Sequence, residues 1–471
     1  MIHRLPFATM ELSGWGRYPV ESCRVFRPEK RSEVAAVLDA GEQTSYIARG
    51  LGRSYGDAAL NQNAGVIWQV LLNRFLTFDS ASGVLECEGG VSLAEIIQYF
   101  LPRGWFLPVT PGTKFVTVGG AIAADVHGKN HHRDGSFSNF ILDLRLLTAG
   151  GEILLCSPSE HAEVFWATAG GMGLTGIILS ARLRLRRVDS AYVLVDFHKA
   201  PNLDDALATM ESSDEHYAYS VAWIDVLARK SSLGRSILMR GNHVAASELP
   251  VRVHRPLASP TSPRWNLFFD FPSGMLNPLT VKAFNTAYYA IHHTAARQVV
   301  SFEKFFYPLD AIDRWNRMYG KRGFVQYQIA LPQASGARGL RTILDRLARS
   351  GRASFLAVLK RFGEAGSGLL SFPLRGYTLA LDIPVANGLV PFLHELDRIT
   401  VDHGGRIYLA KDAVLRPEDF SAMYPKLDSF QAIQRKLDPR GLFSSSLARR
   451  LGILKVTNEQ VTSDEQTTSG G

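Results

Sequence analysis

Short apolar runs alternate with amphipathic stretches between residues 20 and 190. The runs VIWQVLL, VLECEGG and ILDLRLLTAGGEIL, which begin at residues 66, 84 and 141, predict strands joined by turns. The stretch SLAEIIQYFLPRG has the apolar spacing of an amphipathic helix, which we expect to end at Pro102. This part of the chain is therefore expected to mix helices and strands.

The pattern changes at about residue 190, after which glycines become fewer and aromatic residues more frequent. Residues 250–280 are rich in proline and aromatic residues and have little periodicity, so we expect a long loop there: a lid, a binding loop or a disordered insert. Residues 337–352 predict a helix with one apolar face, formed by Leu340, Ile343, Leu344 and Leu347. Its arginine-rich remainder is expected to be solvated, with membrane contact as the alternative. The polar end, VTNEQVTSDEQTTSGG, is expected to fray.

Composition indicates a folded globular protein. The 471 residues are 46% hydrophobic and 20% charged, and this length favours two domains. No run reaches the roughly 18 apolar residues of a membrane helix, and charges and proline interrupt the N-terminal apolar stretch, so we expect a cytoplasmic location. The three widely spaced cysteines argue against a disulfide framework and are expected to be small buried residues.

The chain is basic, with a net charge of +8. A solvated basic surface accounts for such a charge, and so does attraction to an anion such as a phosphorylated substrate or an acidic membrane face. No nucleic-acid-binding motif is recognisable, so nucleic acid is the least favoured partner.

Glycine-rich segments carry the first sign of a binding site. The segment ARGLGRSYGDAALN follows the apolar run SYIA, and successive glycine turns can point backbone N–H groups at a pyrophosphate. Its spacing matches neither GxGxxG nor a P-loop, and a simple turn is the alternative. A second segment, TPGTKFVTVGGAIAADVHGKNHHRDGSFSN, brings small residues to a predicted helix start, where the helix N-terminus can approach a large flat ligand. A third segment, FWATAGGMGLTGII, adds another glycine-rich approach.

The three segments, in this order and at these separations, resemble the FAD-binding domain of the vanillyl-alcohol oxidase (PCMH-type) family. Further blocks, among them GFVQYQ, LSFP, GGRIYLAKD and DPRGLFSSSLARRL, are similar to those of one branch of it, the decaprenylphosphoryl-β-D-ribose 2′-oxidases. The resemblance implies a two-domain α+β fold. An FAD-binding domain would span residues 1–191, an antiparallel-sheet substrate domain would span 192–404 and roof the flavin, and residues 405–471 would return to the first domain.

The same resemblance implies which residues hold FAD. In the family the first loop binds the pyrophosphate and the later two segments line the isoalloxazine. The positions that match are Ala48, Arg49, Gly50, Leu51, Gly52, Arg53, Ser54, Tyr55, Gly56, Gly112, Thr113, Thr117, Val118, Gly119, Gly120, Ala123, Ala124, His127, Ile178 and Tyr408. Many members of the wider family carry a flavin-linking histidine where this chain has Arg53, so we expect the FAD to be held non-covalently.

Oxidising a secondary alcohol needs a base near the hydroxyl and positive charge near the flavin. By resemblance, Lys411 in the AKD turn lies beside flavin and substrate, as base or as electrostatic stabiliser, although taken alone it reads as a surface lysine. Tyr55 is the second proton-handling candidate, with a core tyrosine as the alternative. His127 and Lys129 of the HGKN segment are expected to face the same pocket. A zinc site at His127 is not indicated, because no HExxH glutamate or third ligand accompanies it.

Other pocket positions come from the second domain. Gln326 and Gln328 alternate with Tyr327, so both amides face one side of a predicted strand, and Gln328 matches a pocket position of the family. The substrate-binding candidates are Trp223, Lys360, Thr378 and Ala380, with Lys360 as a candidate for the substrate phosphate. Trp223 could equally belong to the core, and Lys360 could equally be exposed. Thr378 and Ala380 replace an amide and a thiol of the family, and FFYPLD replaces FYHPLD, which puts the exact sugar and lipid in doubt.

The resemblance implies an activity: FAD-dependent oxidation of the 2′-hydroxyl of a polyprenyl-phosphate β-D-ribose. A separate NAD(P)H-dependent keto-reductase would complete the epimerisation to the arabinose. The basic surface and the 250–280 segment are consistent with peripheral docking at the inner face of a membrane, and we expect that segment to act as a mobile lid. The alternatives are an oxidase of a soluble polyol, sugar or aldonolactone, and a flavin-binding module without turnover.

Overall fold

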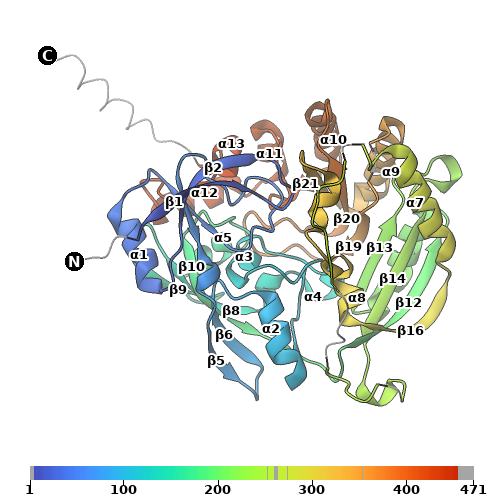
Figure 1. Ribbon diagram of the computed structural model, residues 1–471, viewed down its shortest axis with the longest axis horizontal. Coiled ribbons are helices and arrows are strands. Elements are labelled where there is room, and N and C mark those ends of the chain that lie inside the picture. Colours follow the sequence, from blue (N-terminus) through green and yellow to red (C-terminus); the bar gives the residue numbers. More distant parts are fainter. Residues whose placement is uncertain (1–4, 252, 259–263, 273, 353, 455–471) are drawn as a thin grey trace.

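The computed structural model describes residues 5–251, 253–258, 264–272, 274–352 and 354–454. Three sheets organise this part of the chain, with the two smaller ones on the left of Figure 1 and the largest on the right. The mixture of helices with separate, mostly antiparallel sheets confirms the predicted two-domain α+β class. The predicted fraying of the last residues concerns positions 455–471, which lie outside the described residues.

The first half of the chain builds two sheets. The first has the order β1 (Phe7–Ser13), β2 (Val20–Phe26), β4 (Gly65–Trp68) and β3 (Tyr46–Arg49). The second has the order β5 (Phe75–Asp79), β6 (Val84–Glu88), β10 (Ile177–Arg184), β8 (Ile141–Leu147) and β9 (Ile153–Cys156). The helices of this half are α1 (Arg31–Ala40), α2 (Leu93–Phe100), α3 (Val118–Ala123), α4 (His131–Asp134) and α5 (Ala162–Thr168), with a small ribbon of β7 (Trp105–Phe106) and β11 (Arg186–Arg187).

An antiparallel sheet of eight strands dominates the rest. Its order is β16 (Ala295–Ser301), β12 (Tyr192–Ala200), β14 (Ser236–His243), β13 (Tyr219–Ile224), β19 (Ala357–Phe362), β20 (Gly376–Pro384), β18 (Phe324–Pro332) and β21 (Arg406–Ile407). It is contacted by α6 (Leu203–Ser213), α9 (Gln333–Ser350) and α10 (Leu389–Asp402). The other elements are α7 (Pro278–Ile291), α8 (Phe302–Phe306), α11 (Pro417–Met423), α12 (Leu427–Leu437), α13 (Ser446–Leu451) and the pair β15 (Trp265–Asn266) and β17 (Ile312–Asp313).

The C-terminal segment returns to the first sheet. Phe443 forms a parallel bridge with Tyr46, and the Ser444 amide donates to the Tyr46 carbonyl at 3.0 Å. The eight-stranded sheet takes its last strand, β21, from just beyond residue 404, the boundary expected from the sequence. Within the described ranges, no helix is long and apolar enough to cross a membrane.

Several local predictions are confirmed and others need correction. The apolar face of α9 is buried, and the three cysteines are buried free thiols. The amphipathic helix α2 ends two residues earlier than expected, at Phe100, and Leu101–Arg103 form a 3-10 turn around the proline. Only the beginning of VIWQVLL is a strand, because Gln69–Leu71 form a 3-10 turn. The 250–280 segment is not loop throughout, since it contains β15 and the start of α7.

Candidate active site

A cavity lies where the three glycine-rich segments meet the eight-stranded sheet. The first segment contributes Gly50 to Tyr55, and the third contributes Met172 and Gly173. The second contributes several of the residues between Thr110 and Lys129. Across from them, alternate residues of β13, β18 and β19 line the cavity: Val221, Trp223, Gln326, Gln328, Val358 and Lys360. Residues two apart on a strand share a face, so this face of the sheet forms the roof of the cavity.

The glycine segments leave room for a flat cofactor at the backbone. A methyl group placed at Gly112 would meet no atom within 4 Å, and one at Gly120 would meet only the Thr117 hydroxyl, at 3.0 Å. Both glycines line the cavity, so any side chain there would take up its volume. The buried Nδ1 atom of His127, which also lines the cavity, has no hydrogen-bond partner among the described residues. The expected FAD therefore fits a cradle of exposed backbone that ends at an unpaired imidazole nitrogen.

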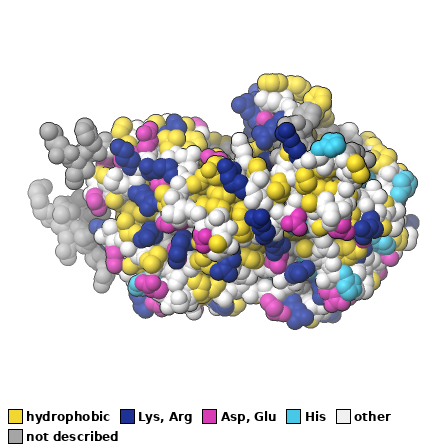
Figure 2. Space-filling view, turned by 90° about the horizontal axis from the view of Figure 1, so that it is seen from below, with side chains coloured by type: hydrophobic (Ala, Val, Ile, Leu, Met, Phe, Trp, Pro, Cys, Tyr) yellow, Lys and Arg dark blue, Asp and Glu magenta, His cyan; other side chains and the backbone are white. Residues whose placement is uncertain are grey.

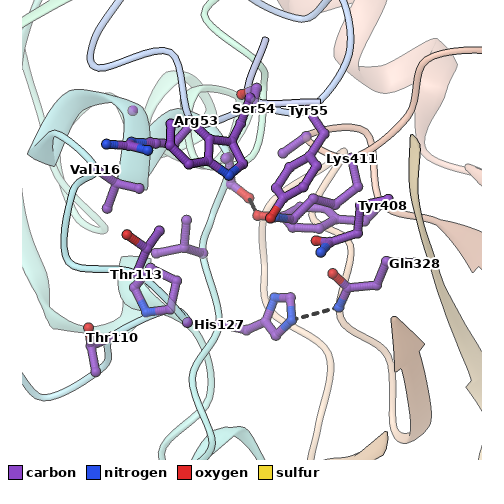
Figure 3. A pocket seen from close by; sticks show the side chains of 18 of the residues that line it. Arg53, Ser54, Tyr55, Thr110, Thr113, Val116, His127, Gln328, Tyr408 and Lys411 are labelled. Carbon is purple, nitrogen blue, oxygen red and sulfur yellow. Dashed lines mark hydrogen bonds between the residues drawn. The ribbon is translucent and has the colours of Figure 1, made fainter. Parts of the chain in front are cut away.

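His127 joins the two halves of the site. Its Nε2 lies 2.9 Å from the Gln328 amide nitrogen, which also donates to the Thr378 hydroxyl at 3.1 Å (Figure 3). Because an amide nitrogen can only donate, Nε2 accepts and the ring proton is on Nδ1. Burial and the nearby Lys360 lower the pKa of His127 well below its ordinary value, so the ring is neutral. Thr378 is fully buried and does not line the cavity; it orients Gln328 instead.

Lys411 and Tyr55 form the second functional group. The Lys411 ammonium lies 3.8 Å from the centroid of the Tyr55 ring, and the two side chains stand together in Figure 3. The Tyr55 amide donates to the Ala410 carbonyl at 2.9 Å, which ties the first loop to the AKD turn. Burial lowers the pKa of Lys411 to about 7, and burial raises the pKa of Tyr55 well above 10. At neutral pH the tyrosine is protonated, whereas the lysine is poised to gain or lose a proton.

Asp382 supplies a buried carboxyl that the sequence did not reveal. It accepts from the Gln326 amide at 2.6 Å and from the Tyr319 hydroxyl at 3.3 Å. Burial raises its pKa to about 7, and the charge of Lys411 counteracts that rise. Asp382 in turn raises the pKa of Lys411, against the effect of burial. Two groups with pKa values near 7 thus share this end of the site.

Two more lysines line the cavity from opposite halves. Lys129 donates to the Phe305 carbonyl and lies 4.3 Å from the centroid of the Phe305 ring. Burial, reinforced by Lys360, lowers the pKa of Lys129 to about 7. Burial lowers the pKa of Lys360 to about 8. An anion in the cavity would restore the charged forms of these amines and would be bound in return.

Arg53 is held by aromatic rings. Its guanidinium lies 3.8 Å from the Trp15 ring centroid and 5.5 Å from that of Phe115, and its Nε donates to the Phe115 carbonyl at 3.2 Å. The arginine lines the cavity at the position where the wider family carries its flavin-linking histidine. Stacking on Trp15 thus fixes a permanent positive charge in the cavity wall.

An ion bridge fixes the turn that carries Lys411. Arg450 of α13 donates to Asp57 at 2.7 Å and to Asp412 at 2.8 Å, and both carboxylates are almost fully buried. Asp412 also accepts from the Val414 amide at 2.9 Å. Burial lowers the pKa of Arg450, but the two carboxylates outweigh it and raise that pKa above its ordinary value. The C-terminal helix α13 therefore joins the first loop to the AKD turn.

Most of the residues expected from the sequence line the cavity, and four do not. Arg49 points away and donates to the Ala59 and Ser13 carbonyls. Gly56 packs against the Asp412 carbonyl, where a side chain would clash, and Val118 is fully buried in the core. Thr378 lies behind Gln328. Among the lining residues that were not expected as site residues are Trp15, Pro111, Tyr288, Asp310 and Trp315. Of these, Asp310 belongs to FFYPLD, whereas no motif marks Tyr288.

Comparison with known proteins agrees with this geometry. Residues 23–157 match the family model for the FAD binding domain, and residues 320–451 match that for D-arabinono-1,4-lactone oxidase. The decaprenylphosphoryl-beta-D-ribose oxidase of Mycolicibacterium smegmatis is 40% identical over 95% of this chain and 99% of its own. The L-gulono-1,4-lactone dehydrogenase of Mycobacterium tuberculosis is 22% identical over 93% of this chain and 98% of its own. The L-gulonolactone oxidase of Scyliorhinus torazame is 25% identical over 90% of this chain and 94% of its own.

The expected cofactor and reaction class are thereby confirmed. The FAD-binding match covers the first loop and the whole second segment, and the oxidase match covers Gln328 and Lys411. The first two glycine segments and the roof strands β18 and β19 lie inside the matched ranges. The chain is an FAD-dependent oxidoreductase and belongs to the family of the decaprenylphosphoryl-β-D-ribose oxidases.

Proposed function

We propose that the protein oxidises the 2′-hydroxyl of a polyprenyl-phosphate β-D-ribose to the 2′-keto sugar. The charge of the cavity carries this proposal. Of the described residues that line it, Arg53, Lys129, Lys360 and Lys411 are basic, whereas Asp310 alone is acidic. Such an excess of positive charge suits a phosphorylated substrate better than a neutral sugar. The 40% identity to the ribose oxidase of M. smegmatis supports the same substrate class.

Residues of the first half of the chain would hold the cofactor. The backbone of the first loop would bind the FAD pyrophosphate, and the cradle around Gly112 and Gly120 would accept the isoalloxazine, with His127 Nδ1 as a donor to it. Bound FAD supplies the hydride acceptor for alcohol oxidation. Arg53 offers no nucleophile for a covalent link, so the cofactor is held by contacts alone.

Lys411 is the group best suited to take the hydroxyl proton. Its pKa of about 7 matches neutral pH, where a general base works best, whereas Tyr55 with its raised pKa stays protonated and donates a hydrogen bond. Asp382 holds the charge that forms on Lys411. Lys360 and Lys129, on either side of the cavity, would bind the phosphate of the substrate.

The second candidate is an oxidase of an aldonolactone or another soluble sugar. The match of residues 320–451 to the D-arabinono-1,4-lactone oxidase model favours it. The two candidates separate in one anaerobic experiment, in which each substrate is added to the FAD-loaded protein and the visible flavin absorption is followed. We expect bleaching with a polyprenyl-phosphate ribose and none with aldonolactones. Bleaching by lactones alone would favour the second candidate, and no bleaching with either would indicate a flavin-binding module.

A second enzyme is required to complete an epimerisation. The keto sugar has lost two electrons, and its reduction to the arabinose needs a hydride donor, so we propose a separate NAD(P)H-dependent keto-reductase as partner. Incubated with substrate and NADPH, the purified protein alone is expected to accumulate the keto sugar. Formation of the arabinose product without a second protein would contradict this.

Peripheral binding to the inner face of a membrane is the location that we propose. Three aromatic side chains of the 264–271 segment are largely exposed: Trp265 and Phe268 at 75% and Phe269 at 63%. The neighbouring Arg264 adds positive charge, as expected for contact with anionic headgroups. On the face drawn in Figure 2, a projecting group of apolar side chains lies beside lysine and arginine groups. We expect F268D/F269D to lose cosedimentation with anionic vesicles; unchanged binding would refute this surface.

A further inference from the structure

Helix α7 (Pro278–Ile291) presents an exposed apolar surface. Only Val281 and Asn285 of its 14 residues are buried. Leu279 is 80% exposed, Phe284 46% and Ile291 68%, and the helix carries one charged residue, Lys282. An amphipathic helix of a globular protein ordinarily turns its apolar side to the core. Here the apolar side faces outward, which marks a binding surface.

Polar contacts hold the other side of α7 in place. The Asn285 amide donates to Asp225 at 2.7 Å, and Arg235 pairs with the same carboxylate at 2.8 Å. The Tyr289 hydroxyl donates to the Ala200 carbonyl at 3.2 Å. These contacts anchor the helix at the ends of β12 and β13, and none of them uses Phe284, Leu279 or Ile291.

The exposed surface continues into the active-site cavity. Trp223 and Tyr288 both line the cavity, and their ring centroids are 4.6 Å apart. Tyr288 stacks on Phe284 at 5.8 Å, and Phe284 meets Phe355 edge-on at 5.9 Å. Trp223, Tyr288 and Phe284, here called the aromatic track, thus lead from the cavity wall to the outer face of α7.

The track begins next to the basic wall of the cavity. In the strand register Trp223 lies opposite Val358, and Lys360 follows two residues later on the same face of the sheet. A ligand with a phosphate on Lys360 would have its neighbouring apolar group at Trp223. The cavity therefore offers an anion site and an apolar exit side by side.

We propose that the aromatic track binds the polyprenyl chain of the substrate. The inference rests on the proposed function, which gives the substrate a phosphate joined to a long apolar chain. Each isoprene unit that lies on Tyr288 and Phe284 leaves water and covers aromatic surface that is otherwise exposed, and both changes favour binding. The chain occupies the track, and the bilayer does not, because the track opens into the cavity that holds the sugar.

Two substrates of different chain length test the track. A ribose phosphodiester with a single isoprene unit reaches only the first rings, whereas its farnesyl counterpart extends to Phe284. For Phe284→Ser we expect the KM for the farnesyl substrate to rise about tenfold or more, since most of a phenylalanine contact is lost. The KM for the one-isoprene substrate and the kcat for both should stay within about twofold of the wild type.

Ile153→Ser is the matched control, because it removes an exposed apolar side chain of β9, which belongs to the other half of the molecule. It should change neither KM. Retained FAD absorption shows that each variant is folded. The proposal would be overturned if Phe284→Ser raised the KM equally for both substrates, or for neither. A Phe284→Ser variant that loses vesicle binding but keeps its farnesyl KM would also overturn it, because the bilayer would then be the occupant.

Failure of the proposed function and failure of the aromatic track can be told apart. Flavin reduction of the wild type by the one-isoprene substrate tests the proposed function alone. If it fails, equilibrium binding of farnesyl phosphate, followed by tryptophan fluorescence, still tests the track. Weaker binding to Phe284→Ser than to Ile153→Ser would support the track, and equal binding would overturn it.

Discussion

Replacing Lys411 with methionine should reduce activity and increase stability at the same time. Methionine retains the apolar stem and most of the volume, but it removes the amine that lies 3.8 Å from the Tyr55 ring. Positioned acid–base groups contribute about 10²- to 10⁴-fold to proton transfer, so flavin reduction should slow by that factor. This corresponds to about 3–5 kcal/mol of transition-state stabilisation. The FAD content should be unchanged, because backbone groups form the cradle.

The gain in stability follows from the pKa of the lysine. Burial lowers that pKa from 10.5 in the unfolded chain to about 7 in the folded one. Between pH 7 and pH 10.5 the unfolded chain binds more protons than the folded one, so the stability of the folded protein rises with pH in this range. Below pH 7 the lysine is charged in both states, and the folded state bears the full cost of burying that charge. That cost is about 5 kcal/mol as an upper bound, reduced by solvent screening because the amine is only partly buried. At pH 6, Lys411→Met should therefore melt several degrees higher than the wild type.

Stopped-flow flavin reduction and thermal melting, each at several pH values, check both effects. The wild-type reduction rate should rise with pH through an ionisation near 7, and this ionisation should be absent from Lys411→Met. The difference in melting temperature should shrink as the pH approaches 10. A variant that reduces its flavin at the wild-type rate would remove Lys411 from the mechanism. A variant less stable than the wild type at pH 6 would refute the buried-amine argument.

Four further predictions concern the frame of the site. Arg450→Met leaves two buried carboxylates unpaired, so thermal unfolding should show a loss of about 3–5 kcal/mol; an unchanged melting temperature would refute the bridge. The Cβ of Gly112→Val would meet no atom within 4 Å, so the protein should fold normally but copurify with little FAD, and full FAD occupancy would contradict the cradle. Because Arg53 cannot link flavin, acid precipitation should release all FAD into the supernatant, and a yellow pellet would argue against this. Asp270 pairs with Arg17 and Arg317, so Asp270→Asn should speed limited proteolysis of residues 264–272; an unchanged rate would argue against a mobile lid there.

The sequence predicted those parts of the site that lie on local patterns. Glycine turns depend on neighbouring residues, so the cradle was visible in the three glycine segments. The alternation in FVQYQIAL likewise placed Gln326 and Gln328 on one face of β18, and both line the cavity. Within these motifs, however, sequence alone did not separate lining residues from supporting ones. Arg49 and Val118 match the cofactor motif, yet hydrogen bonds to the Ala59 and Ser13 carbonyls and burial in the core take them away from the cavity.

The parts that escaped prediction are set by strand pairing and interdomain packing. Asp382 stands opposite Gln326 because β18 and β20 pair in one register, and no local pattern in GYTLALDIP marks it as the counter-charge of Lys411. Tyr288 lines the cavity from a helix that Asn285 ties to Asp225, 60 residues away in sequence. Lys411 likewise has a lowered pKa because it is buried where its turn meets the first loop, a contact that no local pattern reveals. The catalytic chemistry of this chain is therefore a property of the assembled halves, and variants that loosen their contact should lose the ionisation near pH 7 before they lose FAD.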